Sequence, residues 1–456
     1  MTSEPTRKPL ALEAAVTTST GSPAGQLRAN PVDLDGRRAF LVAYAADCPV
    51  DPYVEMFFFP TDTLKLVLFA ADGKEIWRRD LGRGVVPGSH FCPVYAFDLD
   101  GDGTDEIWYV NNTNTDHPLG ISGYVLERLD ARTGETTGQW PWPRKEYDTR
   151  LSHQFRNFIF GGHVRGEPVL VTAEGTYEDM HLQGWRSDMS FRWRHDIAAD
   201  TPGARGSHMF AITDLDGDGV EEVMWGERNI ELDTGAELFC ADRDSYRGHS
   251  DVVQPVWDES EKRWVIYTCR ESDRDVSPRV ATFDAKGRRI WGAVAEGHMD
   301  MGWVARLGEG GRHVAMAIKI GAKSAGPDGL HHRGTIEYAF DVFTGERTEF
   351  PFSVYRTVPV DLDGDGYHEL VRNIPGSDGE ILSRSGERLG EVGGAIALTG
   401  RLLDTPGEQL FTYYPDGTIK IWADRNAEDT DAAKARYAHP FYVANSRHAG
   451  SILAGV

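Results

Sequence analysis

The stretch Asp98-Leu99-Asp100-Gly101-Asp102-Gly103 decides the fold of this 456-residue chain, because full copies of it return at 214–219 and 361–366. Degenerate copies begin at Asp33 and Asp404. Every copy follows an apolar run, and in the full copies a glutamate at the ninth position precedes a second apolar run. These glutamates are Glu106, Glu222 and Glu369. A segment that recurs with the same flanks marks a structural repeat.

Each repeat reads as four short strands, A to D. The Asp-rich turn joins A to B, a variable loop joins B to C, and a tight hairpin joins C to D. The hairpins centre on Gly73, Gly134, Gly235, Gly287, Gly345, Gly386 and Gly417, with Asp188-Met189 in the third unit. We count eight units, and no window has a helical period. The sequence therefore predicts an all-β fold: a single β-propeller with seven or eight blades of four antiparallel strands.

The two ends of the chain suggest how such a ring would close. We assign residues 1–24 to an N-terminal arm and 25–456 to the propeller domain. The eighth unit lacks a clear D strand, and a strand at 10–17 would complete it, which removes two exposed sheet edges at once.

Charge and composition narrow the class of function. The chain carries 71 acidic and 48 basic residues, a formal net charge of −23, which repels nucleic acids and anionic membranes. Four cysteines do not make a disulfide scaffold in a chain of this length. Because no apolar segment of signal-peptide or membrane-spanning length is visible, we expect a cytoplasmic location, or a secreted or periplasmic one if a leader has been removed.

The Asp-rich turns are candidate calcium sites. They are not EF-hands, because position 12 is Tyr109, Trp225 or Arg372 instead of a glutamate. Clustered carboxylates still suit Ca²⁺, although Asp and Gly also form such a turn without metal. The candidate ligands are Asp98, Asp100, Asp102, Glu106, Asp214, Asp216, Asp218, Glu222, Asp361, Asp363, Asp365 and Glu369.

A second set of residues belongs to the opposite face of the propeller, which the D-to-A and B-to-C connections form. Five consecutive D-to-A connections carry a histidine: His90, His153, His208, His249 and His298. Since A strands line the axis, we expect these side chains to converge at one mouth of the central channel. A structural role in capping the strand is the alternative for each one alone.

Other loops add chemistry to this face. They carry His117, Tyr177, His181, Arg205, Tyr246, Arg247, Tyr355 and Arg356. Arg, His and Tyr are the groups that bind a carboxylate and move a proton beside it, as the removal of the C5 hydrogen of a uronic acid requires. Cys240, His249 and Cys269 are candidate zinc ligands, with two buried, unliganded cysteines as the alternative.

These motifs resemble known families. The Asp-rich turns resemble those of FG-GAP propellers, and residues 27–445 resemble the β-propeller polysaccharide lyases, ulvan lyases above all and rhamnogalacturonan lyases more distantly. The resemblance rests on His117, Ser152-His153, Gly175-Thr176-Tyr177, Arg205 to His208 and Tyr246 to Asp251. It implies β-elimination on a rhamnose–uronate glycan, with Tyr177 or Tyr246 as base and acid and His117, His153 and Arg205 neutralising the carboxylate. His90, His208, His298, Arg247, Tyr355 and Arg356 would bind substrate, and calcium or zinc would be structural.

Two other functions fit the sequence. A glycosidase would need paired carboxylates, and this face offers Glu174, Glu178, Asp179, Asp251 and Asp300 without a clear pair. The resemblance to propellers that act on rhamnose–glucuronate linkages implies such linkages as its substrate. A non-catalytic calcium propeller that binds glycan or protein is the second alternative. In the leading hypothesis the partner is an anionic uronate-containing oligo- or polysaccharide.

Overall fold

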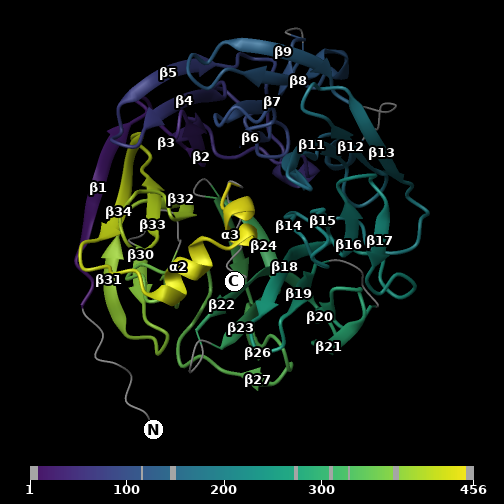
Figure 1. Ribbon diagram of the computed structural model, residues 1–456, viewed down its shortest axis with the longest axis vertical. Helices are drawn as coiled ribbons and strands as arrows, with labels where there is room; N and C mark the ends of the chain where they lie inside the picture. The colour runs from purple at the N-terminus through teal and green to yellow at the C-terminus, as the bar shows by residue number, and fades with distance from the viewer. Residues whose placement is uncertain are drawn as a thin grey trace.

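The computed structural model describes residues 9–114, 117–143, 150–271, 276–307, 312–326, 329–372 and 379–447. Its strands form eight four-stranded antiparallel sheets arranged as blades around a central axis (Figure 1). The predicted all-β propeller is confirmed, and the number of blades is eight. None of the helices in these ranges is long and apolar enough to cross a membrane.

The first four blades use consecutive strands, from the axis outward. They are β2 (Gln26–Leu34), β3 (Arg37–Ala45), β4 (Lys65–Ala70) and β5 (Glu75–Asp80); β6 (Val94–Phe97), β7 (Glu106–Asn112), β8 (Tyr124–Leu129) and β9 (Thr136–Pro141); β10 (Asn157–Val164), β11 (Glu167–Glu174), β12 (Met180–Trp185) and β13 (Phe191–Ile197); and β14 (Ile212–Thr213), β15 (Glu222–Trp225), β16 (Arg228–Glu231) and β17 (Glu237–Cys240).

The last four blades follow the same order, with a two-stranded insertion, β24 (Ala322–Gly326) and β25 (Gly329–Arg333), in the sixth. They are β18 (Ser250–Asp258), β19 (Arg263–Arg270), β20 (Val280–Asp284) and β21 (Arg289–Ala293); β22 (His298–Arg306), β23 (His313–Ile320), β26 (Ile336–Asp341) and β27 (Arg347–Thr348); β28 (Thr357–Val360), β29 (Glu369–Arg372), β30 (Gly379–Leu382) and β31 (Arg388–Val392); and β32 (Ala395–Gly400), β33 (Gln409–Tyr413), β34 (Thr418–Asp424) and β1.

The N-terminal strand closes the ring. Strand β1 (Leu12–Ser19) pairs antiparallel with β34 as the outermost strand of the eighth blade. The expected strand at 10–17 is confirmed, and residues 1–8 of the predicted arm lie outside the described residues. Because β1 comes from the other end of the chain, the last blade ties the two termini together.

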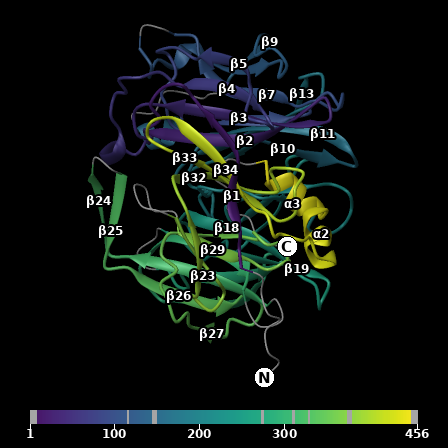
Figure 2. The same cartoon turned by 90° about the vertical axis from the view of Figure 1, so that its left-hand side faces the viewer.

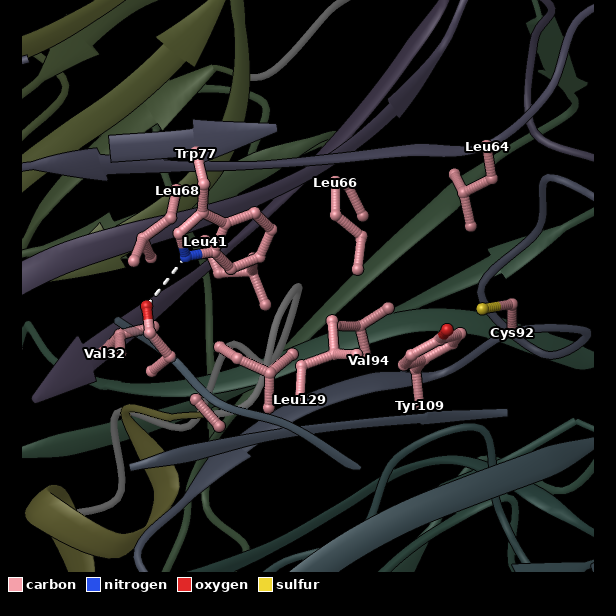
Figure 3. Packing of buried hydrophobic residues seen from close by; sticks show 14 of the residues in the cluster. Val32, Leu41, Leu64, Leu66, Leu68, Trp77, Cys92, Val94, Tyr109 and Leu129 are labelled. Carbon is pink, nitrogen blue, oxygen red and sulfur yellow. Dashed lines mark hydrogen bonds between the residues drawn. The ribbon is translucent and has the colours of Figure 1, made fainter. Parts of the chain in front are cut away.

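Neighbouring blades are joined by one recurring contact. The outer-strand residue Trp77 donates a hydrogen bond from Nε1 to the carbonyl of Ala131 in the next blade, 2.7 Å away, and its indole packs on Gly134 of that blade's hairpin. Figure 3 shows this indole among the apolar side chains between the first two blades. A Cβ on Gly134 would meet the indole at 2.6 Å, so this hairpin position needs glycine for its packing as well as for its φ of 72°.

The C-terminal segment closes the face of the Asp-rich turns. The sequence shows no helical period there, yet the chain forms the short helices α2 (Asp431–Tyr437) and α3 (Pro440–Asn445) across that end of the axis (Figures 1 and 2). The Asn445 side chain makes two hydrogen bonds with the backbone of Ile212, and Arg447 pairs with Asp33 and Asp105 at 2.7 Å. These helices lie at the end of the axis away from the D-to-A connections.

Candidate functional site

The histidines predicted to converge do so at the mouth opposite α3. His208 and His249 stack with ring centroids 5.1 Å apart, and His90 lies 5.8 Å from His208. His153, on the short helix α1 (Leu151–Gln154), lies 6.3 Å from the ring of Tyr177. His298 meets Glu271, the carboxylate that also faces His249. The five D-to-A histidines therefore form one continuous group.

Three carboxylates join three of these histidines in arrangements that suit metal ions. One group is His208, His249, Asp251 and Glu271, and the other is Glu271, His298 and Asp300. Within each group the candidate ligand atoms lie within 4.8 Å of one another. Imidazole and carboxylate donors at this spacing fit a divalent transition-metal ion such as Mn²⁺.

Local backbone irregularities aim two of these carboxylates. In β18 the register shifts between Ser250 and Val252, and in β22 it shifts between Met299 and Met301. The extra residues are Asp251 and Asp300, each two positions after a histidine. A β-bulge turns its extra residue away from the regular alternation of the strand. The repeated pattern His-x-Asp was therefore the sequence signal for these ligands, which the sequence analysis considered only as possible glycosidase carboxylates.

A buried ion pair holds the strands that carry these ligands. The Glu227 carboxylate accepts hydrogen bonds from Ser250 Oγ at 2.8 Å, Thr268 Oγ1 at 3.0 Å and Arg270 Nε at 2.9 Å. Ser250 precedes Asp251, and Arg270 precedes Glu271. Burial disfavours the charged guanidinium, but the Glu227 carboxylate outweighs this effect and raises the pKa of Arg270. The Glu227–Arg270 ion pair therefore fixes β18 and β19 next to Asp251 and Glu271.

Tyr177 lies beside the metal-ligand group. Its hydroxyl is 3.1 Å from His208 Nε2, and its ring meets the ring of His249 edge-on at 4.3 Å. Its backbone φ is 84°, a left-handed conformation that is rare outside glycine and is often found at functional sites. Burial raises the pKa of Tyr177, while the nearby Arg156 guanidinium opposes that rise. Tyr177 is thus held against His208 by strained backbone.

Arg156 brings a cation to this site, and no motif in the sequence marked it. Its guanidinium lies 5.3 Å from the centre of the Tyr177 ring, is 2% exposed, and donates from Nη2 to Asp51 at 3.1 Å. Among the described residues, Nε and Nη1 have no hydrogen-bond partner. A buried guanidinium with unused donors is suited to an anionic group of a ligand.

A cavity of about 430 Å³ lies beside His208. His90 and His208 line it, together with Arg28 and Asn157. Burial, followed by the nearby Arg156 charge, holds the pKa of both histidines well below its ordinary value. Both imidazoles are therefore neutral near pH 7, the form that accepts a proton or binds a metal.

Several predicted residues lie elsewhere. Tyr246 is fully buried, and its hydroxyl donates to the backbone carbonyl of His249 at 2.5 Å, a position that does not suit a base acting on substrate. Arg205 is 3% exposed and its guanidinium donates to backbone carbonyls, including that of Ala198 at 3.0 Å. Arg247 is exposed and donates to the carbonyl of Ala199. Tyr246 and Arg205 therefore support loops, a role that their residue types did not reveal.

The remaining predicted residues lie apart from this group, His117, Tyr355 and Arg356 on loops and His181 on strand β12. His117 follows β7, is exposed, and has its ring 5.8 Å from that of Phe59. Tyr355 and Arg356 precede β28, and the Arg356 guanidinium lies 5.6 Å from the Tyr355 ring. His181 pairs with Asp196 on the neighbouring strand. The substrate-binding roles of His117, Tyr355 and Arg356 stay predictions.

The predicted zinc ligands do not come together. Cys269 is buried in the apolar core with its sulfur 3.1 Å from the Tyr267 hydroxyl, and burial raises the pKa of its thiol to about 12. Cys240 ends β17, where burial also raises the thiol pKa. Among the described residues, the metal-ligand group of His249 contains carboxylates and a second histidine, and no cysteine.

The Asp-rich turns lie on the face that α2 and α3 cover. In the first turn, Asp98 already accepts hydrogen bonds from three backbone amides, including that of Gly101 at 2.8 Å. In the second copy, Glu222 joins the three aspartates in one group, and burial with the neighbouring carboxylates raises its pKa to about 8. In the third, Arg436 of α2 lies 3.7 Å from Asp361. The second copy therefore offers a cation the fullest set of oxygens.

Two curated proteins are similar to this chain in sequence. Rhamnogalacturonan exolyase YesX of Bacillus subtilis is 27% identical over 274 residues, which cover 52% of this chain and 44% of that protein. Rhamnogalacturonan endolyase YesW of the same organism is 24% identical over 306 residues, covering 56% and 47%. Both curated relatives are rhamnogalacturonan lyases. The chain spans about half the length of these relatives. No protein-family model matches the sequence.

Solved structures agree on the fold. The crystal structure of YesX aligns with a TM-score of 0.75 at 20% identity, covering 96% of this chain and 79% of that one. Rhamnogalacturonan lyase PL11 of Bacillus licheniformis aligns with a TM-score of 0.73 at 17% identity, covering 97% and 83%. The predicted similarity to propeller polysaccharide lyases is confirmed. These relatives belong to the rhamnogalacturonan branch, which the motifs placed second to the ulvan branch.

Proposed function

We propose that this propeller is the catalytic body of a lyase that cleaves an acidic, rhamnogalacturonan-like polysaccharide by β-elimination next to a uronic acid. The observation that carries the proposal is the contact of the Tyr177 hydroxyl with His208 beside the His249–Asp251–Glu271 group. This contact places a candidate proton-transfer residue, Tyr177, beside a group that can hold a cation. The curated relatives, which are lyases by name, support the same reaction class.

The first chemical requirement is to stabilise negative charge. Removing the C5 proton of a uronate places a second negative charge on its carboxylate group, so donors must be in place before the proton leaves. Arg156 offers two nitrogens, Nε and Nη1, that have no hydrogen-bond partner among the described residues. A divalent cation held by His208, His249, Asp251 and Glu271 would add positive charge beside the same carboxylate.

The second requirement is a proton route. Tyr177 is the residue that we assign to the C5 proton and to the leaving oxygen at C4, because its oxygen lies 3.1 Å from His208 Nε2 beside the cation group. As a tyrosinate, which the Arg156 charge and a cation in this group would favour, it takes the C5 proton and then gives that proton to the C4 oxygen as the glycosidic bond breaks. His208 holds that oxygen in place through Nε2, while its Nδ1 faces Asp251 in the cation group. His153, 6.3 Å from the tyrosine ring, limits where the sugar ring can lie.

Ultraviolet absorbance tests the reaction, because β-elimination leaves an unsaturated uronate and hydrolysis does not. The purified protein is mixed with rhamnogalacturonan, with ulvan and with glucuronate–rhamnose oligosaccharides. We expect absorbance to rise with rhamnogalacturonan, and Tyr177→Phe to lower the rate by about 10²- to 10⁴-fold. Tyr338→Phe, on an outer strand of the sixth blade, is the matched control. New reducing ends without new absorbance would instead identify a glycosidase.

A further inference from the structure

We propose that the site binds two divalent cations bridged by the carboxylate of Glu271, with His298 and Asp300 as the other ligands of the second cation. The inference rests on the proposed function for its biological purpose, but its chemistry stands on the geometry alone. The first cation site is the His208, His249, Asp251 and Glu271 group described above.

The two oxygens of Glu271 face different histidines. Oε2 contacts His249 Nε2, whereas Oε1 lies 2.5 Å from His298 Nε2. On the second side, Asp300 Oδ1 lies 3.1 Å from the same His298 nitrogen. The six side chains fall into two groups that share this one carboxylate. A carboxylate with one oxygen in each group is the usual bridge in two-metal sites, where the ions are about 3.5–4 Å apart.

The two blades present their ligands in the same way. His249 and Asp251 come from the start of the fifth blade, and His298 and Asp300 come from the start of the sixth. In both, the aspartate is the extra residue of a bulge. The second group therefore repeats, in the next blade, the histidine and bulged aspartate of the first group.

Charge favours two ions over one. The three carboxylates carry a formal charge of −3, so one divalent cation brings their sum to −1 and two bring it to +1. A uronate carboxylate is repelled by the first arrangement and attracted by the second. A second cation therefore adds to the attraction that Arg156 offers an anionic substrate.

Exposure assigns different roles to the two positions. The His249 side chain is 3% exposed, whereas that of His298 is 37% exposed. The second group also supplies three protein ligands where the first supplies four. A three-ligand site leaves coordination positions open, as catalytic metal sites do. The second cation is therefore the one that contacts the substrate carboxylate.

Cobalt titration tests the stoichiometry without any need for activity. Metal-free protein is titrated with Co²⁺ and followed by its visible absorption, with Ca²⁺ present to fill oxygen-only turns. Cys48, which is exposed, is replaced by serine in every sample to remove its thiol. We expect two equivalents in the parent protein and one in His298→Gln or Asp300→Asn. His195→Gln, on the outer strand β13, should keep two. Circular dichroism checks that each variant is folded.

The outcomes separate this inference from the proposed function. One equivalent in the parent protein, unchanged by His298→Gln, overturns the second site and leaves the lyase proposal standing. One equivalent that His298→Gln abolishes shows a single ion and also overturns it. No bound Co²⁺ removes both sites. Two equivalents in a protein that is inactive on every glycan support the two-metal site and count against the lyase.

Discussion

Replacing Glu227 with glutamine should destabilise the protein and weaken its metal site together. The Glu227 and Arg270 side chains are both 0% exposed, and the guanidinium donates to this carboxylate at 2.9 and 2.5 Å. Glutamine removes the negative charge, and its amide group sets N–H donors against the donors of Arg270. The buried cation then loses its main partner.

The loss in the free energy of unfolding depends on the partners that the remaining charge keeps. Breaking a buried ion pair costs about 3–5 kcal/mol when it leaves the other charge uncompensated. Here Arg270 keeps Asp242 at 2.7 Å and the carbonyl of Pro278 at 3.0 Å, so we expect Glu227→Gln to cost about 3 kcal/mol. Arg270→Met should cost about 4–5 kcal/mol, because Glu227 would keep only the hydroxyls of Ser250 and Thr268 as donors.

The assay is urea unfolding of the two single variants and the double variant, followed by Co²⁺ titration of the folded proteins. In the double variant the charge mismatch disappears, so the coupling energy should be about 2 kcal/mol or more. Cobalt affinity should fall in both single variants because β18 and β19 carry Asp251 and Glu271. A cost below about 1 kcal/mol for Glu227→Gln, or a coupling near zero, would refute the reasoning.

Three other predictions use separate measurements. Arg156→Ala should lower kcat/KM on rhamnogalacturonan by about 10²- to 10³-fold, with partial recovery in Arg156→Lys; equal activity would remove Arg156 from the site. Calcium at 100 times its Kd for the second Asp-rich turn should add about 2.7 kcal/mol to the free energy of unfolding, and Asp216→Asn should abolish this gain; an unchanged melting midpoint with chelator would exclude the metal. Burial, followed by the charges of Arg306 and Arg436, lowers the pKa of His313 from 6.5 to about 3. As the pH falls, His313 is therefore protonated in the unfolded chain before it is protonated in the folded protein, and the free energy of unfolding decreases between pH 6.5 and pH 3. Urea unfolding at pH 7 and pH 5 should show a decrease of about 2 kcal/mol in the free energy of unfolding of the parent protein. The His313→Gln variant should lack this decrease.

The repeat pattern determined the architecture because strand period and turn chemistry are local. Asp-rich turns and hairpin glycines mark where each strand reverses, and eight such units bury their faces only by forming a ring. The same counting located the face that carries His208, His249 and His298. The C-terminal helices were not predicted, because they are too short to show a helical period in the sequence. Tertiary contacts of Asn445 and Arg447 hold them in place.

Only the tertiary structure decided which residues meet at the mouth. Tyr177 and Tyr246 were equal candidates by residue type, but one hydroxyl faces His208 and the other is buried against a backbone carbonyl. Glu271 and Arg156 had no motif to mark them, because their importance comes from strands of neighbouring blades that converge. The separation of two residues along the chain does not reveal their distance across the ring of blades. Burial, charge and β-bulges then set the directions in which the side chains at the mouth point.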